Sequence, residues 1–368
     1  MKIAVLTSSR ADYGIYQPLL KALEADPFFD LRLIVFGSHL AKNFGLTINQ
    51  IINDGYIIDH KIDEMPADDS PLGISASIGK TIKAFGQVWK SSSYDLVLAL
   101  GDRFEMFAAV VSGLPFNVRF AHIHGGETTL GAIDDAFRHS ISLMSEYHFT
   151  SAETYKNRVA QIIGKDQKIF NTGSLGIDFL SSLELLSKEE FKIRYNIDLT
   201  RPFILSTIHP ETVSFERNAA YMDEFVKAMM MLDGYQIIVT MPNADTSGMV
   251  IREKLHSLSK ERDNVILVEN FGSVGYLSCM KHCEMLIGNT SSGFYDASFF
   301  PKWVINLGDR QKGRIRTPNI LDVEFDADDI TKAIELISGK PLPLFEPVYG
   351  DGHAASKIIK ILKDEFSN

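Results

Sequence analysis

The sequence contains little of what secreted, membrane-spanning or nucleic-acid-binding proteins need. Only Cys279 and Cys283 are cysteines among its 368 residues. Two are too few for a disulfide framework or a structural zinc site, so we interpret both as small buried side chains. No stretch approaches the roughly 18 consecutive apolar residues of a transmembrane helix, and the first apolar run is too short for a secretory signal peptide. The formal net charge is -10 without a long basic run, which argues against nucleic acid or an anionic membrane as a partner. We therefore expect a cytoplasmic protein.

Length and composition predict two globular domains. A chain of 368 residues suffices for two domains of roughly 100–200 residues each, and its 45% apolar and 23% charged residues are ordinary for globular proteins. Short runs rich in Val, Ile and Leu alternate with amphipathic helical patterns, which is typical of a parallel sheet covered on both faces. In the first half we expect strands at residues 2–7, 31–37, 94–100, 118–123, 147–150 and 169–172.

The alternation is interrupted at residues 181–200, which we interpret as the connection between the two domains. It then resumes, with strands expected at residues 203–207, 236–240, 265–268, 285–288 and 303–307. Two Rossmann-like, doubly wound α/β domains in series are the simplest architecture, formed by residues 1–180 and 201–350. The last residues, 354–368, are predicted to form an amphipathic helix.

Ligands of open parallel sheets bind beyond the carboxyl ends of the strands, so the residues that follow each apolar run deserve inspection. Arg10 follows the first run, in a strand-to-helix turn that lacks the GxGxxG pattern of a dinucleotide site. Its guanidinium suits a phosphate or carboxylate, although it also fits an ordinary surface arginine. Asp102 follows the run that ends at Leu100, and fits a helix N-cap as well as a catalytic acid.

Three further carboxylates follow the next strand of the first half. Glu127 comes after two glycines, which allow a ligand to approach the backbone closely. Asp134 and Asp135 open a predicted helix with Arg138 one turn later, a spacing that also fits an acidic cap with salt bridges. Carboxylates gathered around one cleft repel each other and raise the pKa of at least one of them, as general acid–base catalysis near neutral pH requires.

The second half offers groups that suit phosphate instead of proton transfer. Small residues at the start of a predicted helix suit the binding of a phosphate, although the lysine of a Walker A loop is missing. These residues are Ser291, Ser292 and Gly293. Asp296, further along this helix, suits ribose hydroxyls. Arg310 and Arg314 follow the next strand and complement a diphosphate, unless that loop is merely a solvated one. His209 also follows a strand, and a lone histidine in such a place is as often structural.

Taken together, these motifs resemble the hydrolysing UDP-N-acetylglucosamine 2-epimerases, bacterial enzymes of the sialic acid pathway. The resemblance implies a fold like the GT-B glycosyltransferases, with two Rossmann-like domains facing across a cleft and the helix 354–368 packing back on the first. It also implies a homo-oligomer, a dimer or a tetramer. The matching stretches, in one order from residue 8 to about 314, are SRADYG, LGDRFEMFAA, HIHGGE, IDDAFRHSIS, TGSLG, HPET, NADT, GNTSSG and GDRQKGR.

The resemblance further implies a reaction. A base removes the proton at C2 of the sugar, UDP leaves from C1, and a 2-acetamidoglucal forms. Water then adds at C1 and a proton returns to C2 on the other face, which releases N-acetylmannosamine and UDP. The chemistry needs neither a redox cofactor nor a metal. By match to the family's motifs, the acid–base groups are Asp102, Glu127 and Asp134 or Asp135.

The remaining site residues follow from the same resemblance. His209 is expected near the diphosphate and the sugar, and Tyr276 near the uridine. Arg138 belongs to the expected substrate-binding set. The residues expected to hold UDP are Arg10, Ser291, Ser292, Gly293, Asp296, Arg310 and Arg314.

Several alternatives stay open at the level of sequence. The same chemistry on UDP-2,4-diacetamido-2,4,6-trideoxyglucose, of the legionaminic acid pathway, fits these motifs, and so does a non-hydrolysing 2-epimerase. Selectivity between the sugars is expected in the loop 64–72. His122, His124, Glu127 and Asp102 also permit a metal-dependent hydrolase. A glycosyltransferase of the same fold and a non-catalytic nucleotide-sugar sensor complete the alternatives.

Overall fold

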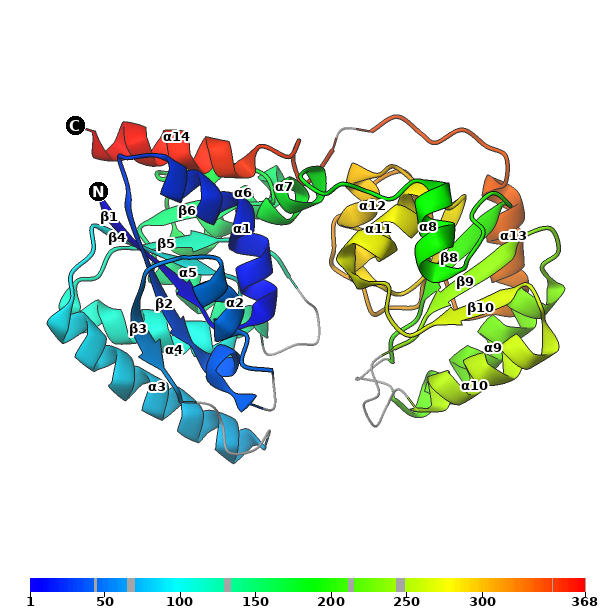
Figure 1. Cartoon of the computed structure of the whole chain (residues 1–368), viewed down its shortest axis with the longest axis horizontal. Coiled ribbons are helices and arrows are strands. Elements are labelled where there is room, and N and C mark those ends of the chain that lie inside the picture. The colour runs from blue at the N-terminus through cyan, green and yellow to red at the C-terminus, as the bar shows by residue number, and fades with distance from the viewer. Residues whose placement is uncertain are drawn as a thin grey trace. The chain divides into compact units, whose positions relative to one another are not determined.

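The chain folds into two compact units, each built around its own parallel sheet (Figure 1). The structure is a computed structural model and describes residues 1–42, 45–64, 70–128, 134–210, 215–242, 249–345 and 347–367. Unit 1 comprises Met1–Ser182 and Tyr349–Asn368, and unit 2 comprises Leu183–Val348. Two Rossmann-like α/β units confirm the predicted fold class. Within the described ranges, no helix combines the length and the apolar character needed to cross a membrane.

The sheet of unit 1 has the strand order β3-β2-β1-β4-β5-β6-β7, so the order reverses between β1 and β4. Successive residues of β1 point to opposite faces: Ile3 and Val5 enter one apolar cluster, whereas Ala4 and Leu6 enter another. Helices cover both faces, which explains why the central strands are continuously apolar. The strands are β1 (Lys2–Thr7), β2 (Asp30–Phe36), β3 (Ile58–Ile62), β4 (Leu96–Leu100), β5 (Phe120–Ile123), β6 (Tyr147–Thr150) and β7 (Ile169–Asn171).

The last helix of the chain, α14 (Ala354–Phe366), packs in unit 1 against α1 (Arg10–Ala25) and α7 (Leu175–Ser181) (Figure 1). The Asp178 carboxylate accepts the backbone N–H groups of Ala354 and Ala355 at 2.8 and 2.6 Å, and so satisfies the first turn of α14. The other helices of unit 1 are α2 (Ile48–Asn53), α3 (Pro71–Ser91), α4 (Phe104–Gly113), α5 (Asp134–Leu143) and α6 (Glu153–Ile163), with short 3₁₀ turns η1 (Gly37–Leu40) and η3 (Leu114–Phe116).

The sheet of unit 2 has the order β10-β9-β8-β11-β12-β13 and reverses between β8 and β11. Its strands are β8 (Phe203–Thr207), β9 (Gln236–Thr240), β10 (Val265–Val268), β11 (Met285–Gly288), β12 (Trp303–Leu307) and β13 (Ile320–Val323). Its helices are α8 (Lys188–Tyr195), α9 (Asn218–Met231), α10 (Met249–Glu261), α11 (Gly272–His282), α12 (Asp296–Phe299) and α13 (Ala327–Ile337), with 3₁₀ turns η4 (Phe215–Arg217) and η5 (Ser291–Gly293).

Two details differ from the sequence-based expectations, and some of the predicted segments are not tested. The strands β3 and β13 were not predicted. The segment 181–200, interpreted as a connection, contains α8, whose Phe191 is fully buried in an apolar cluster of unit 2. Parts of the predicted loop 64–72 and of the HPET and NADT motifs, namely residues 65–69, 211–212 and 243–246, lie outside the described residues.

Candidate functional site

A cluster of charged side chains lies in unit 1, at the carboxyl ends of β4 and β5 and on the first turns of α5. Arg138 forms ion pairs with Asp102 and, at 3.2 Å, with Asp135. The Arg138 side chain is only 7% exposed, whereas the two carboxylates are 25% and 22% exposed. A buried guanidinium with two charged acceptors fixes the orientation of both carboxylates. The structure thus places Arg138 between the acids of the site.

Asp102 does not cap the helix that follows it. The N-cap of α4 is Arg103, and no side chain accepts a hydrogen bond from the first turn there. The capping interpretation of Asp102 is therefore wrong, and its carboxylate is committed to Arg138 instead.

Asp134 behaves as the sequence predicts for a carboxylate in such a cluster. Partial burial raises the pKa of Asp134, and the nearby charge of Asp102 raises it further, against the opposing effect of Arg138. Removal from water and a like charge both disfavour the ionised form. Asp134 is accordingly the carboxyl group in this cluster best suited to retain a proton at higher pH.

Glu127 lies next to Ser151, at the end of β6, and next to His124, in its own turn after β5. Its Oε1 accepts a hydrogen bond from Ser151 Oγ at 2.7 Å, and it lies 3.9 Å from Nδ1 of His124. His124 adopts a left-handed backbone conformation with φ +64°, which is uncommon for a residue other than glycine. Burial lowers the pKa of His124, so its imidazole is largely neutral. Glu127 is thus fixed in a partly buried position, with side-chain exposure of 12%.

The two glycines before Glu127 lie close to other protein atoms. A Cβ at Gly125 would lie 2.9 Å from both His122 Nδ1 and Ser142 Oγ. A Cβ at Gly126 would lie 2.4 Å from the Tyr155 carbonyl oxygen. These glycines therefore let the turn after β5 pack against α5 and α6, and the expected approach of a ligand to their backbone stays a prediction.

His122 is neutral and has both ring nitrogens engaged. Its Nε2 lies 2.8 Å from the Gly101 carbonyl oxygen and its Nδ1 lies 2.9 Å from Ser142 Oγ, so Nε2 donates and Nδ1 accepts. Burial lowers the pKa of His122 to about 3. In the part of the chain that the structure describes, no three His, Cys, Asp or Glu side chains are grouped to hold a metal ion.

Arg10 begins α1 at the carboxyl end of β1, with an exposed side chain. Its turn is held by Asp12, a residue that the sequence analysis did not single out. The buried Asp12 carboxylate accepts hydrogen bonds from the backbone N–H of Ser8 at 2.9 Å and of Ser9 at 3.1 Å. Ser9 and Asp12 form a capping box, whose S-x-x-D spacing was visible in the sequence.

A second group of polar residues lies in unit 2, at the carboxyl ends of β8, β11 and β12. The Asn289 amide binds the backbone of His209 through two hydrogen bonds of 2.7 and 2.9 Å. The Asn289 carbonyl accepts hydrogen bonds from Arg310 Nη1 at 3.2 Å and from Gln311 Nε2 at 2.8 Å. Asn289 and Gln311 were not predicted as site residues, because buried amides leave no periodic signal in a sequence.

The turn after β11 is not the helix start that the sequence predicts. Residues Ser291–Gly293 form the 3₁₀ turn η5, and α12 contains only four residues. A helix this short has little macrodipole, so the cradle depends on hydroxyls and local N–H groups. Ser292 Oγ lies 2.6 Å from Tyr276 Oη. Gly293 is needed for packing, since a Cβ there would lie 2.9 Å from a methyl of Val304.

The remaining predicted residues of unit 2 differ in their surroundings. Burial raises the pKa of Asp296 to about 7. Arg310 is exposed, whereas Arg314 donates from Nε to Gln311 Oε1 at 2.7 Å and lies over the Tyr295 ring at 5.2 Å. Arg310 is the more exposed of the two arginines, although its Nη1 also donates to the Asn289 carbonyl.

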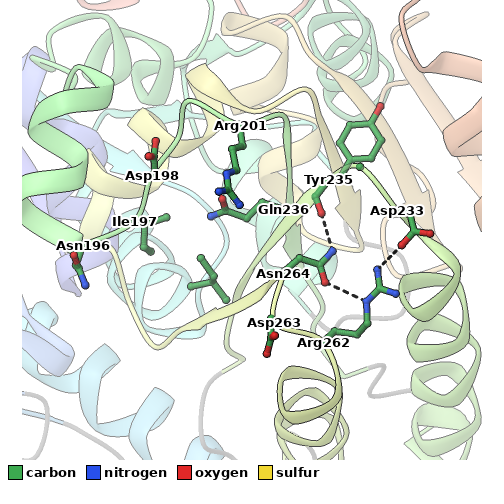
Figure 2. A pocket seen from close by; sticks show the side chains of 12 residues that line it. Asn196, Ile197, Asp198, Arg201, Asp233, Tyr235, Gln236, Arg262, Asp263 and Asn264 are labelled. Atoms are coloured by element: carbon green, nitrogen blue, oxygen red, sulfur yellow. Dashed lines mark hydrogen bonds and ion pairs between the residues drawn. The ribbon is translucent and has the colours of Figure 1, made fainter.

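A cavity of about 570 Å³ also exists in unit 2, but at the amino ends of the strands (Figure 2). Its lining includes Arg201, Gln236 and Asn264, which lie at the amino ends of β8, β9 and β10. The Asn264 amide donates to the Tyr235 carbonyl and accepts from Arg262, as Figure 2 shows. The group around Asn289 lies at the carboxyl ends of the strands, so this cavity at their amino ends is separate from it. Ligands of open parallel sheets bind at the carboxyl ends.

Comparisons with known proteins show which family the chain resembles. A family model described as UDP-N-acetylglucosamine 2-epimerase matches residues 21–363. The GDP/UDP-N,N'-diacetylbacillosamine 2-epimerase (hydrolyzing) of Campylobacter jejuni is 35% identical over 340 residues, which cover 92% of this chain and 88% of that protein. Polysialic acid biosynthesis protein P7 of Escherichia coli is 37% identical over 336 residues, with coverage of 91% and 85%.

A solved structure extends the likeness to the fold. The crystal structure of UDP-GlcNAc 2-epimerase from Neisseria meningitidis bound to UDP-GlcNAc has a TM-score of 0.82 and 18% sequence identity. The match covers 99% of this chain and 100% of that one. The likeness to an epimerase structure over the whole chain supports the predicted GT-B-like fold.

Proposed function

Because the chain belongs to the UDP-N-acetylglucosamine 2-epimerase family, we propose that it is a hydrolysing 2-epimerase that converts UDP-N-acetylglucosamine to N-acetylmannosamine and UDP. The observation that carries the proposal is the cluster of Asp102, Asp135 and Asp134 around the buried Arg138. Carboxyl groups with different environments are what a reaction needs that first removes and then returns a proton at one carbon.

The proposed reaction has two halves. In the first, a carboxylate takes the proton from C2 while the C1–oxygen bond breaks, the electron pair stays on UDP, and a 2-acetamidoglucal remains. In the second, water adds its hydroxyl group at C1 and gives its remaining proton to a carboxylate, while a carboxyl group delivers a proton to C2 on the opposite face. Asp134, with its raised pKa, suits the proton-donating role, and Asp102 and Glu127 are the candidate bases.

The leaving group needs help because a proton beside an acetal carbon is weakly acidic. Cations that meet the charge developing on UDP lower the barrier for its departure. We assign this role to the exposed Arg310 and Arg10, with His209 beside the diphosphate and Ser291, Ser292 and Arg314 supporting it. Tyr276 and Asp296 are assigned to the uridine and the ribose. Gly293 lets the turn pack close to β12.

A second substrate is supported by the relative from Campylobacter jejuni, which is a GDP/UDP-N,N'-diacetylbacillosamine 2-epimerase (hydrolyzing). That sugar has the same acetamido group at C2, so the proton chemistry would be identical. The preference for one of the two sugars depends on contacts around C4 and C6. The acid–base residues are assigned to C1 and C2 and do not determine that preference.

Nuclear magnetic resonance of each UDP-sugar incubated with the protein in deuterated water tests the proposal. We expect UDP and a free 2-epimerised sugar that carries deuterium at C2. Retention of the original C2 hydrogen would exclude the glucal mechanism. A UDP-linked product would indicate a non-hydrolysing epimerase, and binding without any product would indicate a sensor. A reaction that requires an added acceptor would indicate a glycosyltransferase.

A further inference from the structure

Asn289 is fully buried at the carboxyl end of β11, where a side-chain amide must be hydrogen-bonded to be tolerated. Its Oδ1 accepts the His209 backbone N–H at 2.7 Å, and its Nδ2 donates to the His209 carbonyl at 2.9 Å. Both ends of one amide thus bind the backbone of a single residue. This pairing fixes where the chain runs after β8 and hence where the His209 side chain starts.

The backbone of Asn289 forms hydrogen bonds with residues at the ends of two other strands, β8 and β12. Its N–H donates to the Thr207 carbonyl at 3.2 Å, and its carbonyl accepts from Arg310 Nη1 at 3.2 Å and Gln311 Nε2 at 2.8 Å. Gly288 permits this close approach, because its φ is +148° and a Cβ there would lie 2.0 Å from the Thr207 carbonyl oxygen. The exits of β8, β11 and β12 therefore meet at Asn289.

We propose that Asn289 is a positioning residue that sets His209 and Arg310 for the diphosphate of the UDP-sugar. The inference rests on the proposed function, in which those two residues contact the substrate. Asn289 itself has no exposed surface and acts through its hydrogen bonds. Loss of the amide would remove both of these hydrogen bonds from the His209 backbone and hold it less firmly, so the ligand would have to meet part of the cost of ordering it.

Asn319 provides a matched control. It is also a fully buried asparagine of unit 2, and its Nδ2 donates to a backbone carbonyl, that of Lys302, at 2.6 Å. It precedes β13 and therefore lies at the amino ends of the strands, away from the group around Asn289. A purely structural asparagine should affect stability in the same way and UDP binding much less.

The test compares UDP affinity by calorimetry and thermal unfolding for wild type, Asn289→Ala and Asn319→Ala. We expect Asn289→Ala to weaken UDP binding about tenfold or more, and Asn319→Ala to weaken it less than about threefold, at similar losses of thermal stability. If Asn289→Ala does not fold, Asn289→Ser carries the same comparison, because its hydroxyl is too short to bridge both backbone groups. Equal effects of the two positions on UDP affinity would overturn the proposal.

A double-mutant cycle separates positioning from a merely local defect. If the Asn289 amide acts through His209, adding His209→Ala to Asn289→Ala should weaken UDP binding by less than His209→Ala does in wild type, whereas the bond to Arg310 comes from the Asn289 backbone carbonyl and remains in Asn289→Ala. Multiplicative losses would show independent roles and contradict the inference.

Turnover of the UDP-sugars by wild type is measured in parallel. A wild type that binds UDP without forming product refutes the epimerase proposal alone, and turnover with no effect of Asn289→Ala on UDP affinity refutes this inference alone. A wild type that does not bind UDP refutes both.

Discussion

Replacement of Arg138 by methionine should destabilise unit 1 by about 2–4 kcal/mol at pH 7. Each charge-assisted hydrogen bond to a carboxylate contributes roughly 1.5–3 kcal/mol, and Arg138 makes such bonds to Asp102 and Asp135. We expect less than the full sum because these carboxylates are 25% and 22% exposed and regain some hydration. Methionine fills most of the vacated volume, so the loss reports on charge more than on a cavity.

The difference in the free energy of unfolding between Arg138→Met and wild type should become smaller as the pH falls. Arg138 opposes the raised pKa of Asp134, so its removal raises that folded-state pKa further above the unfolded value. A carboxyl group with a raised folded pKa disfavours folding when ionised, and this cost disappears as protons bind at lower pH. This effect brings the stabilities of the variant and wild type closer together as the pH falls from about 7 to about 4.

Thermal unfolding followed by circular dichroism from pH 4 to 8 measures this difference. At roughly 2–4 °C per kcal/mol for a domain of this size, Arg138→Met should unfold about 4–16 °C lower at pH 7. Arg119→Met is the control, since Arg119 pairs with Glu146 at 2.7 Å but is 42% exposed and should cost less than about 1 kcal/mol. An Arg138→Met protein as stable as the control, or a deficit that does not change with pH, would refute the reasoning.

Two further predictions concern unit 1. Gly126→Ala should destabilise the protein by about 2–4 kcal/mol, because φ is +81° and the new Cβ would lie 2.4 Å from the Tyr155 carbonyl oxygen. The control Gly164→Ala, at φ +70° in open space, should cost only about 1 kcal/mol. Denaturant unfolding of both variants measures the difference, and equal losses of stability would contradict the steric argument. Asp102→Asn and Glu127→Gln should reduce turnover by at least about a hundredfold while UDP affinity stays within a few-fold; a large loss of UDP affinity in both variants would show that these residues are structural.

All interior strands could be read from the sequence, but one edge strand of each sheet could not. In unit 2 the five predicted strands coincide with β8 to β12. The strands that escaped prediction, β3 and β13, each lie at one edge of a sheet, whereas the opposite edge strands, β7 and β10, were predicted. The sequence of β3, Ile58-Asp59-His60-Lys61-Ile62, mixes charged and apolar residues because the strand is partly exposed. Without a continuous apolar run, only pairing with a neighbouring strand identifies it.

The candidate site shows the same division. The ion pair of Asp135 with Arg138 follows from a helical spacing of three residues, which any reader of the sequence can recognise. The partnership of Arg138 with Asp102 joins positions 36 residues apart and arises only when β4 and α5 pack together. Two other hydrogen bonds depend on which strand ends lie next to one another. They are the bond from Ser151 to Glu127 and the bond from the His209 backbone to Asn289.

By itself, the sequence determined the alternation of strands and helices, the division into two Rossmann-like sheets, and the family to which the acids and the small-residue turn point. These depend on local periodicity and on short motifs, and both are written along the chain. Only the tertiary structure decided that Asp102 pairs with Arg138 instead of capping α4, that Gly125 and Gly126 make room for protein atoms, and that η5 is a 3₁₀ turn. Each of these outcomes depends on atoms that distant segments bring within a few ångströms, and no periodicity encodes such contacts.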